Sequence, residues 1–218
     1  MNKKMFSMLL LLVFVGVYFT SEEASANVTV YDKENRPVVF PVGKYTNEHV
    51  GSGLTWSSGT FLVNPNGQSI FNDSINRIDV PKGYRVIATD DHNFKDTSAW
   101  FEHSIFDFGP LGLKNKISSL IVENIANDPK LPVVYEDHGF GGRQQTLNVG
   151  DYRKKNLSFG NDRISAIRVP AGYTVRMWDD DKYKDRNYTY FGPTYIPFLN
   201  GFNDKVSSLK VRLTGQPI

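Results

Sequence analysis

The stretch NDRISAIRVPAGY at residues 161–173 is a second copy of NDSINRIDVPKGY at residues 72–84, displaced by 89 residues. Extended to residues 72–96 and 161–185, the two copies are identical at 13 of 25 positions without a gap. A match of this length indicates an internal duplication. The chain is therefore expected to hold two homologous domains, and a polar stretch around Pro129 separates them.

A shorter repeat lies within each copy. NDRISA at 161–166 and NDKVSS at 203–208 share the form Asn-Asp-x-apolar-Ser-small, and an alternating apolar run follows each of them. Each predicted domain thus contains two units. We place domain 1 at residues 27–126 and domain 2 at residues 131–213.

The local patterns are typical of β-strands. Residues 28–31, 84–87 and 173–178 are rich in β-branched and aromatic side chains, and turn sequences such as Pro-Lys-Gly separate such runs at short intervals. No stretch of about 12 residues keeps a clear helical period, although residues 116–127 are ambiguous. The pattern predicts an all-β chain of two tandem β-sandwiches.

The first 26 residues resemble a secretory signal peptide. Lys3 and Lys4 precede an apolar run from Met8 to Phe19, which ends before an Ala-x-Ala sequence at 24–26. A membrane-spanning helix would need about 20 apolar residues. We therefore expect cleavage after Ala26 and a secreted, extracellular mature protein that is not an integral membrane protein.

Composition excludes several classes of function. The chain has 25 Lys and Arg against 23 Asp and Glu, so no basic surface for nucleic acid is expected. It has no cysteine, which excludes disulfides, thiolate zinc sites and a cysteine nucleophile, and only four histidines. No Gly-x-Ser-x-Gly elbow or paired acid and base indicates an enzyme. A metal site in this chain would have to use oxygen ligands.

The Asn-Asp-x-x-Ser loops carry a family resemblance. Residues 203–208 match the pattern Asn/Asp-Asn/Asp-x-x-Ser/Thr-Ser fully, and residues 161–166 match it except at the last position. Residues 135–142 also form an aromatic-x4-aromatic-x-Gly hairpin sequence. Residues 178–185 keep both aromatics but have aspartate in the glycine position, and residues 89–96 keep only the second aromatic, Phe94, and also have aspartate there. These combined marks resemble the βγ-crystallin superfamily, whose domains pair two Greek-key motifs.

The resemblance implies calcium binding in domain 2. Hard divalent cations take six to eight oxygens from carboxylates, amides, hydroxyls and carbonyls, so one short loop cannot fill the shell alone. In this family each site combines the loop of one motif with the hairpin of its partner. The implied ligands are Asp162, the Arg163 carbonyl, Ser165, Asp204, the Lys205 carbonyl and Ser207, with Glu136 and Asp179 from the hairpins. The competing interpretation is that these loops are only turns and caps.

Domain 1 departs from the pattern. Its implied ligands are Asp73, Ser74, Asn76 and Ser118. Arg77 occupies the final serine position, and Lys114 occupies the first position of the second loop. A cation beside the ion is repulsive, so we expect weaker binding there, at one site rather than two.

Domain 1 also carries an insertion of 18 residues within 46–71, which includes Trp56. Trp56 and the small polar residues near it could bind a protein or a glycan. Alternatively, the segment is an extra hairpin that covers a sheet edge with Trp56 half-buried.

The sequence thus predicts a secreted, monomeric, calcium-binding protein with a structural or protective role, in which calcium holds the paired Greek keys together. The alternative function is an extracellular interaction module, such as a proteinase inhibitor or a carbohydrate binder, that uses the 46–71 insertion.

Overall fold

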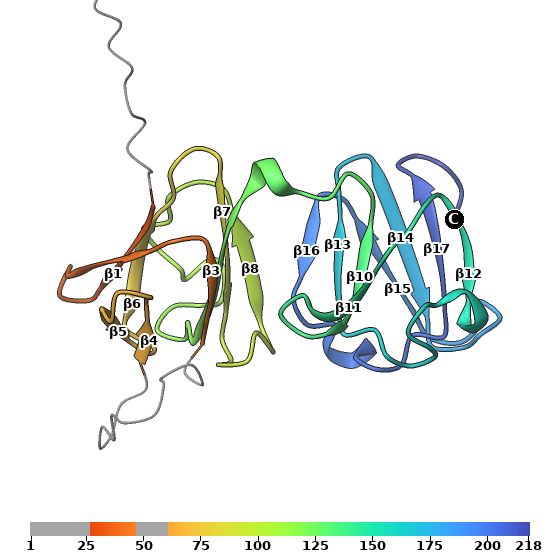
Figure 1. The fold of residues 1–218 in the computed structure, drawn as a ribbon, viewed down its shortest axis with the longest axis horizontal. Helices are drawn as coiled ribbons and strands as arrows, with labels where there is room; N and C mark the ends of the chain where they lie inside the picture. The colour runs from red at the N-terminus through yellow and green to blue at the C-terminus, as the bar shows by residue number, and fades with distance from the viewer. Residues whose placement is uncertain (1–26, 47–60) are drawn as a thin grey trace, which may run out of the picture.

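The computed structural model describes residues 27–46 and 61–218, and its strands form two separate sets of antiparallel sheets (Figure 1). The first set comprises β1 (Val28–Asp32), β2 (Pro37–Phe40), β3 (Gly43–Thr46), β4 (Phe61–Val63), β5 (Ser69–Phe71), β6 (Ile75–Asp79), β7 (Tyr84–Thr89), β8 (Ser98–Phe101) and β9 (Ser119–Asn124). The second set comprises β10 (Val133–Asp137), β11 (Gly141–Thr146), β12 (Gly150–Arg153), β13 (Ala166–Val169), β14 (Tyr173–Trp178), β15 (Asn187–Phe191), β16 (Thr194–Ile196) and β17 (Ser208–Leu213).

Helical structure in the described residues is confined to short 3-10 turns: η2 (Ile125–Asn127), η3 (Lys154–Asn156) and η4 (Asn200–Phe202). The prediction of an all-β chain is confirmed, and the ambiguous segment 116–127 contains strand β9 followed by η2. No helix in the described part of the chain is long and apolar enough to cross a membrane.

Domain 2 shows the strand exchange of paired Greek keys. One sheet has the order β11-β10-β13-β16 and the other has the order β12-β17-β14-β15. Strand β12 from the first half thus joins the sheet of the second half, and β16 from the second half joins the sheet of the first. Because each half contributes to both sheets, neither half is complete without the other.

Domain 1 has the same strand exchange, but the counterpart of β16 is shortened to a single bridge. Its sheets have the orders β2-β1-β6 and β3-β9-β7-β8, so β3 crosses over as β12 does. The counterpart of β16 is only a single bridge between Ile78 and Ile105. The described end of the insertion forms the β4–β5 hairpin, whose Leu62 and Ile70 are buried in the core of domain 1. Trp56 lies outside the described residues.

Buried apolar side chains from the strands fill each sandwich. In β1 the residues alternate between buried and half-buried, and Val28 and Val30 are fully buried. Separate apolar clusters form the cores of domain 1 and domain 2. A third cluster spans both domains, and it contains Ile87 and Phe94 from domain 1 with Tyr135 and Phe140 from domain 2. The two sandwiches lie side by side, joined through η2 (Figure 1).

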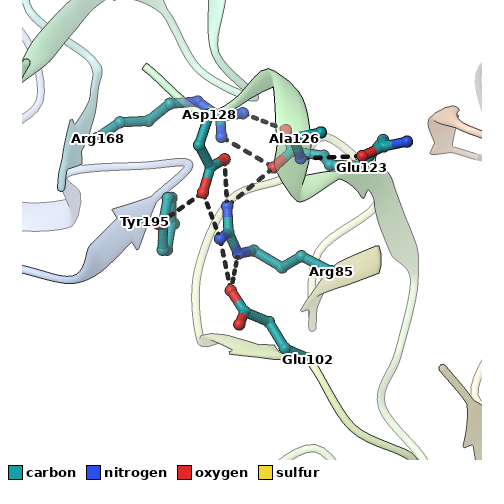
Figure 2. A network of polar contacts seen from close by, with 8 residues as sticks. Arg85, Glu102, Glu123, Ala126, Asp128, Arg168 and Tyr195 are labelled. Atoms are coloured by element: carbon teal, nitrogen blue, oxygen red, sulfur yellow. Dashed lines mark hydrogen bonds and ion pairs between the residues drawn. The ribbon is translucent and has the colours of Figure 1, made fainter. Parts of the chain in front are cut away.

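An ion-pair network borders this third cluster (Figure 2). The Arg85 side chain, 2% exposed, donates two hydrogen bonds to Asp128, at 2.8 and 2.6 Å, and also pairs with Glu102. Asp128 accepts a hydrogen bond of 3.1 Å from the Tyr195 hydroxyl, and Arg168 pairs with Glu123 across the domain boundary. The Arg85 and Arg168 side chains, 2% and 8% exposed, need fixed partners, so these contacts help to fix how the domains dock.

Candidate metal centre

The second residue of each of the four Asn-Asp-type loops has a left-handed backbone. The φ angles are 59° at Asp73, 55° at Asn115, 56° at Asp162 and 52° at Asp204. Asn and Asp adopt this conformation more readily than other residues with a side chain. Asn or Asp at this position therefore both permits the left-handed backbone and supplies a side-chain oxygen.

In domain 2 the two loops exchange hydrogen bonds between side chains. The Ser165 hydroxyl donates to Asp204 Oδ1 at 3.1 Å, and the Ser207 hydroxyl donates to Asp162 Oδ1 at 2.9 Å. Both serines are only 5% exposed, whereas both aspartates are exposed. Each pair thus places a buried hydroxyl beneath a carboxylate that is open to solvent.

Backbone hydrogen bonds fix this crossed arrangement. The Asp162 N–H donates to the Val206 carbonyl at 3.3 Å, and the Asp204 N–H donates to the Ile164 carbonyl at 3.1 Å, so each loop holds the other. The Ser165 and Ser207 N–H groups donate to the carbonyls of Tyr135 and Trp178, both at 2.9 Å. Each serine therefore lies beside the hairpin of its own motif and the aspartate of the partner loop.

We call these two groups site A and site B. Site A comprises Ser165, Asp204 and the neighbouring Glu136, and site B comprises Ser207, Asp162 and Asp179, which follows Trp178. Site A opens into a cavity of about 520 Å³. The cavity is lined by Lys95, Glu136, Asp137, His138, Asp162, Arg163, Ser165, Phe198, Asn203 and Asp204. The loop residues Arg163 and Lys205 are exposed.

The oxygens of this region suit a hard cation. Asn203 Oδ1 and Asp179 Oδ1 are buried without a hydrogen-bond partner among the described residues. A buried polar oxygen left unpaired is costly, and a bound ion would satisfy it. No group of three His, Cys, Asp or Glu suited to a metal occurs in residues 27–46 and 61–218. A cation bound here would need hydroxyl, amide and carbonyl oxygens to complete its shell. With that donor set, the residues fit calcium.

Both hairpin carboxylates already have arginine partners. Glu136 pairs with Arg143 and Arg163, each at 2.7 Å, and the hydrogen bond from Arg143 lowers the pKa of Glu136 to about 2. Asp179 Oδ2 pairs with Arg186 at 3.1 Å, which leaves Oδ1 as its unpaired oxygen. Direct ligation by Glu136 would therefore compete with two guanidinium groups.

Domain 1 retains one crossed pair. The Ser118 hydroxyl donates to Asp73 Oδ1 at 3.3 Å, as Ser207 does to Asp162. Burial raises the pKa of Asp73, and the charge of nearby Asp90 raises it further. We call Ser118, Asp73 and Asp90 site C. Lys116 contacts Asp90 at 3.3 Å and places a cation at this site.

Sequence reasoning missed Asp90. It falls on Asp179 at the 89-residue offset, so the repeat itself could have identified it.

The other half of domain 1 is different. Asn76 is exposed on strand β6, whereas its counterpart Ser165 is buried. The nearby cavity, of about 550 Å³, is lined by Lys33, Glu34, Arg36, Phe71, Asn72, Asp73, Ser74 and Asn115, and Asn76 is not part of it. The Ser74 hydroxyl donates to the Phe71 carbonyl at 2.7 Å. Asn115 thus takes the place of Asp204, and Lys33 and Arg36 line this cavity together with the acidic Glu34 and Asp73.

One of three comparisons with known proteins finds similar chains. No protein-family model matches this chain, and a search of curated proteins finds no match. Among solved structures, a βγ-crystallin domain from Flavobacterium johnsoniae is similar, with 30% identity over 40% of this chain and 100% of that chain, at a TM-score of 0.37. The chain belongs to the βγ-crystallin superfamily. The assignment rests on the residue identities and the motifs, since each superposition covers less than half of this chain.

Two further βγ-crystallin structures are similar. A domain from Clostridium beijerinckii shares 31% identity over 38% of this chain and 97% of that chain, at a TM-score of 0.35. A clostrillin double mutant in complex with nickel shares 31% identity over 38% of this chain and 98% of that chain, also at a TM-score of 0.35.

The final serine of the βγ-crystallin loop has a structural role in this chain. Ser119 Oγ donates to the Asp91 carbonyl at 2.6 Å and accepts from the Phe94 N–H at 3.1 Å. Ser208 likewise bonds the Asp180 carbonyl and accepts from the Tyr183 N–H at 3.2 Å. These serines stabilise the folded hairpins. The last serine of the motif therefore supports a hairpin, whereas the serine before it donates to the aspartate of the partner loop.

Proposed function

We propose that this protein is a secreted, calcium-binding βγ-crystallin in which Ca²⁺ ties together the paired Greek keys, in a structural or protective role. The observation that carries the proposal is the pair of crossed Ser–Asp contacts in domain 2, Ser165 with Asp204 and Ser207 with Asp162. In each contact the two oxygens come from different motifs, so one ion bound there would link both halves of the domain.

Each element of domain 2 would have a defined task. Asp162 and Asp204 would supply charge, Ser165 and Ser207 would supply hydroxyl oxygens, and the exposed loops would supply carbonyls. The unpaired oxygens of Asn203 and Asp179 support the proposal. Each serine donates a hydrogen bond to the aspartate with which it would share the ion.

Such binding would stabilise the folded state because the unfolded chain cannot bring both loops together. At a calcium concentration 100 times the dissociation constant, one site adds about 2.7 kcal/mol to the free energy of unfolding. Extracellular calcium modules bind with dissociation constants up to about 10⁻³ M. For an exported chain without cysteine, bound calcium would replace disulfides as a link between distant residues.

The test is a calcium titration by calorimetry, with melting temperature recorded in millimolar calcium and in chelator. Ser165→Ala and Ser207→Ala should each weaken one site, whereas Ser158→Ala, an exposed serine of the same domain, should leave both unchanged. Neither heat nor a melting shift for the wild-type protein would refute the proposal.

Secretion and a binding role rather than a catalytic one are parts of the same proposal. The N-terminal pattern of Lys3, Lys4 and an apolar run before Ala26 supports export. N-terminal sequencing of protein recovered from the culture medium would test cleavage before Asn27.

A further inference from the structure

The cavity at site A has a wall from the other domain. Its lining residues belong to domain 2 except for Lys95, which lies in the β7–β8 hairpin of domain 1. Lys95 follows Phe94, which is 8% exposed and packs in the cluster shared by the two domains. A positively charged residue of domain 1 therefore borders the cation site proposed for domain 2.

Domain 1 also contacts the hairpin that carries Glu136. A Cβ added to Gly139 would come within 2.5 Å of Phe94 Cδ2, so the Phe94 ring lies directly against this backbone. One residue further on, the Phe140 carbonyl accepts a hydrogen bond of 3.0 Å from Lys44 Nζ of domain 1. The hairpin is thus held from domain 1 at two successive residues.

Hydrogen bonds fix the Phe94 segment of domain 1 and the hairpin that it contacts. The Phe94 N–H donates to Ser119 Oγ at 3.1 Å, and Phe94 has a left-handed φ of 58°. On the other side of the hairpin, the Gly139 N–H donates to the Pro197 carbonyl at 2.8 Å. Site A is therefore built against a fixed surface, and a shift in domain docking would move one of its walls.

We propose that the Phe94–Lys95 tip of domain 1 sets the calcium affinity of site A, so that calcium binding and domain docking are coupled. This inference rests on the proposed calcium function and adds its regulation. Phe94 favours binding because it holds the Glu136 hairpin in place. Lys95 opposes binding because a fixed positive charge repels a divalent cation.

Thermodynamic linkage makes the coupling reciprocal. If docking of domain 1 raises the calcium affinity of site A by some factor, calcium at site A strengthens docking by the same factor. The effect of Lys95 should fall with ionic strength, since salt screens charges that are not buried. The effect of Phe94, which acts by packing, should persist in salt.

The chain offers a matched control. Lys184 occupies the position of Lys95 in the second copy, after Tyr183 instead of Phe94. It is exposed and does not line the site A cavity. Lys95→Gln and Lys184→Gln remove the same charge from equivalent hairpin positions, and of the two lysines only Lys95 lines the site A cavity.

The experiment is calorimetric calcium titration of the full mature chain at low and high salt. Lys95→Gln should tighten one site about threefold at low salt, Lys95→Glu should tighten it further, and Lys184→Gln should change it little. Phe94→Ala should weaken the same site at both salt concentrations. In a Ser165→Ala background the effect of Lys95→Gln should vanish, and in a Ser207→Ala background it should persist.

Two negative results are distinguishable. If the wild-type chain binds calcium but Lys95→Gln and Lys184→Gln behave alike, the coupling is refuted and the proposed function stands. If the wild-type chain gives no calcium heat, both proposals are refuted. Equal salt dependence for Lys95→Gln and Phe94→Ala would also contradict the division of roles.

Discussion

Domain 2 has two crossed Ser–Asp pairs between its loops, whereas domain 1 has one. Ser118 still reaches Asp73, but the position of Ser165 is taken by Asn76, which is exposed on β6. The fold is nevertheless the same, because the strand exchange and apolar cores do not depend on these side chains. The comparison teaches that the paired Greek-key fold persists where one crossed Ser–Asp pair is lost.

Calcium removal should have the largest effect, because it should lower the free energy of unfolding of domain 2 more than that of domain 1. With both sites of domain 2 occupied at 100 times their dissociation constants, calcium should add about 5 kcal/mol to its free energy of unfolding, against at most about 2.7 kcal/mol for the one site of domain 1. Hydrogen exchange with and without chelator measures each domain separately. Equal loss of protection in strands β7 and β14 would contradict the asymmetry.

The docking of the two domains is the next largest effect. Arg85→Met should destabilise the chain by about 2 kcal/mol, since it removes the buried guanidinium that donates two hydrogen bonds to the half-buried Asp128 carboxylate. Denaturant unfolding measures this change. The control is Arg77→Met, which breaks a partly exposed pair with Asp79 and should cost less than about 1 kcal/mol. Equal costs for the two variants would show that the interface network adds no more stability than a partly exposed ion pair.

Removal of one positive charge from domain 1 should bring its calcium affinity closer to that of domain 2. Lys116→Gln removes the cation that contacts Asp90, so site C should bind calcium about three- to tenfold more tightly. Calorimetric titration measures the change, and Lys82→Gln, an exposed lysine of the same domain, is the control. An unchanged affinity at site C would mean that Lys116 swings away when the ion binds.

The smallest effects concern pH in the calcium-free protein. The pKa of Glu136 is lowered from 4.5 to about 2, so its contribution to stability is full above pH 4.5 and lost as the pH falls toward 2. The pKa of Asp73 is raised, so ionisation of Asp73 disfavours the folded state as the pH rises. Glu136→Gln should therefore flatten the acid limb of the stability curve, and Asp73→Asn should slightly stabilise the chelated protein near neutral pH. Urea unfolding from pH 2 to 7 measures both effects.

Much of the fold could be predicted from local signals. The β-branched and aromatic residues in 28–31, 84–87 and 173–178 predicted strands, because such side chains favour an extended backbone, and β1, β7 and β14 lie there. The loops were found because Asn and Asp favour the left-handed turn and also offer oxygens. The use of Ser119 as a hairpin support was not predictable, since both serines of the motif have the same chemistry and only the fold separates them.

The sequence by itself determined the duplication, the strands and the residue types of the loops, because these depend on neighbours along the chain. Only the tertiary structure decided that Ser207 hydrogen bonds to Asp162 and that Glu136 forms ion pairs with Arg143 and Arg163. It also decided that Lys95 of domain 1 borders site A. Such contacts join residues that are far apart in sequence or that face each other only after folding. They follow from strand exchange and domain docking, which no local pattern encodes.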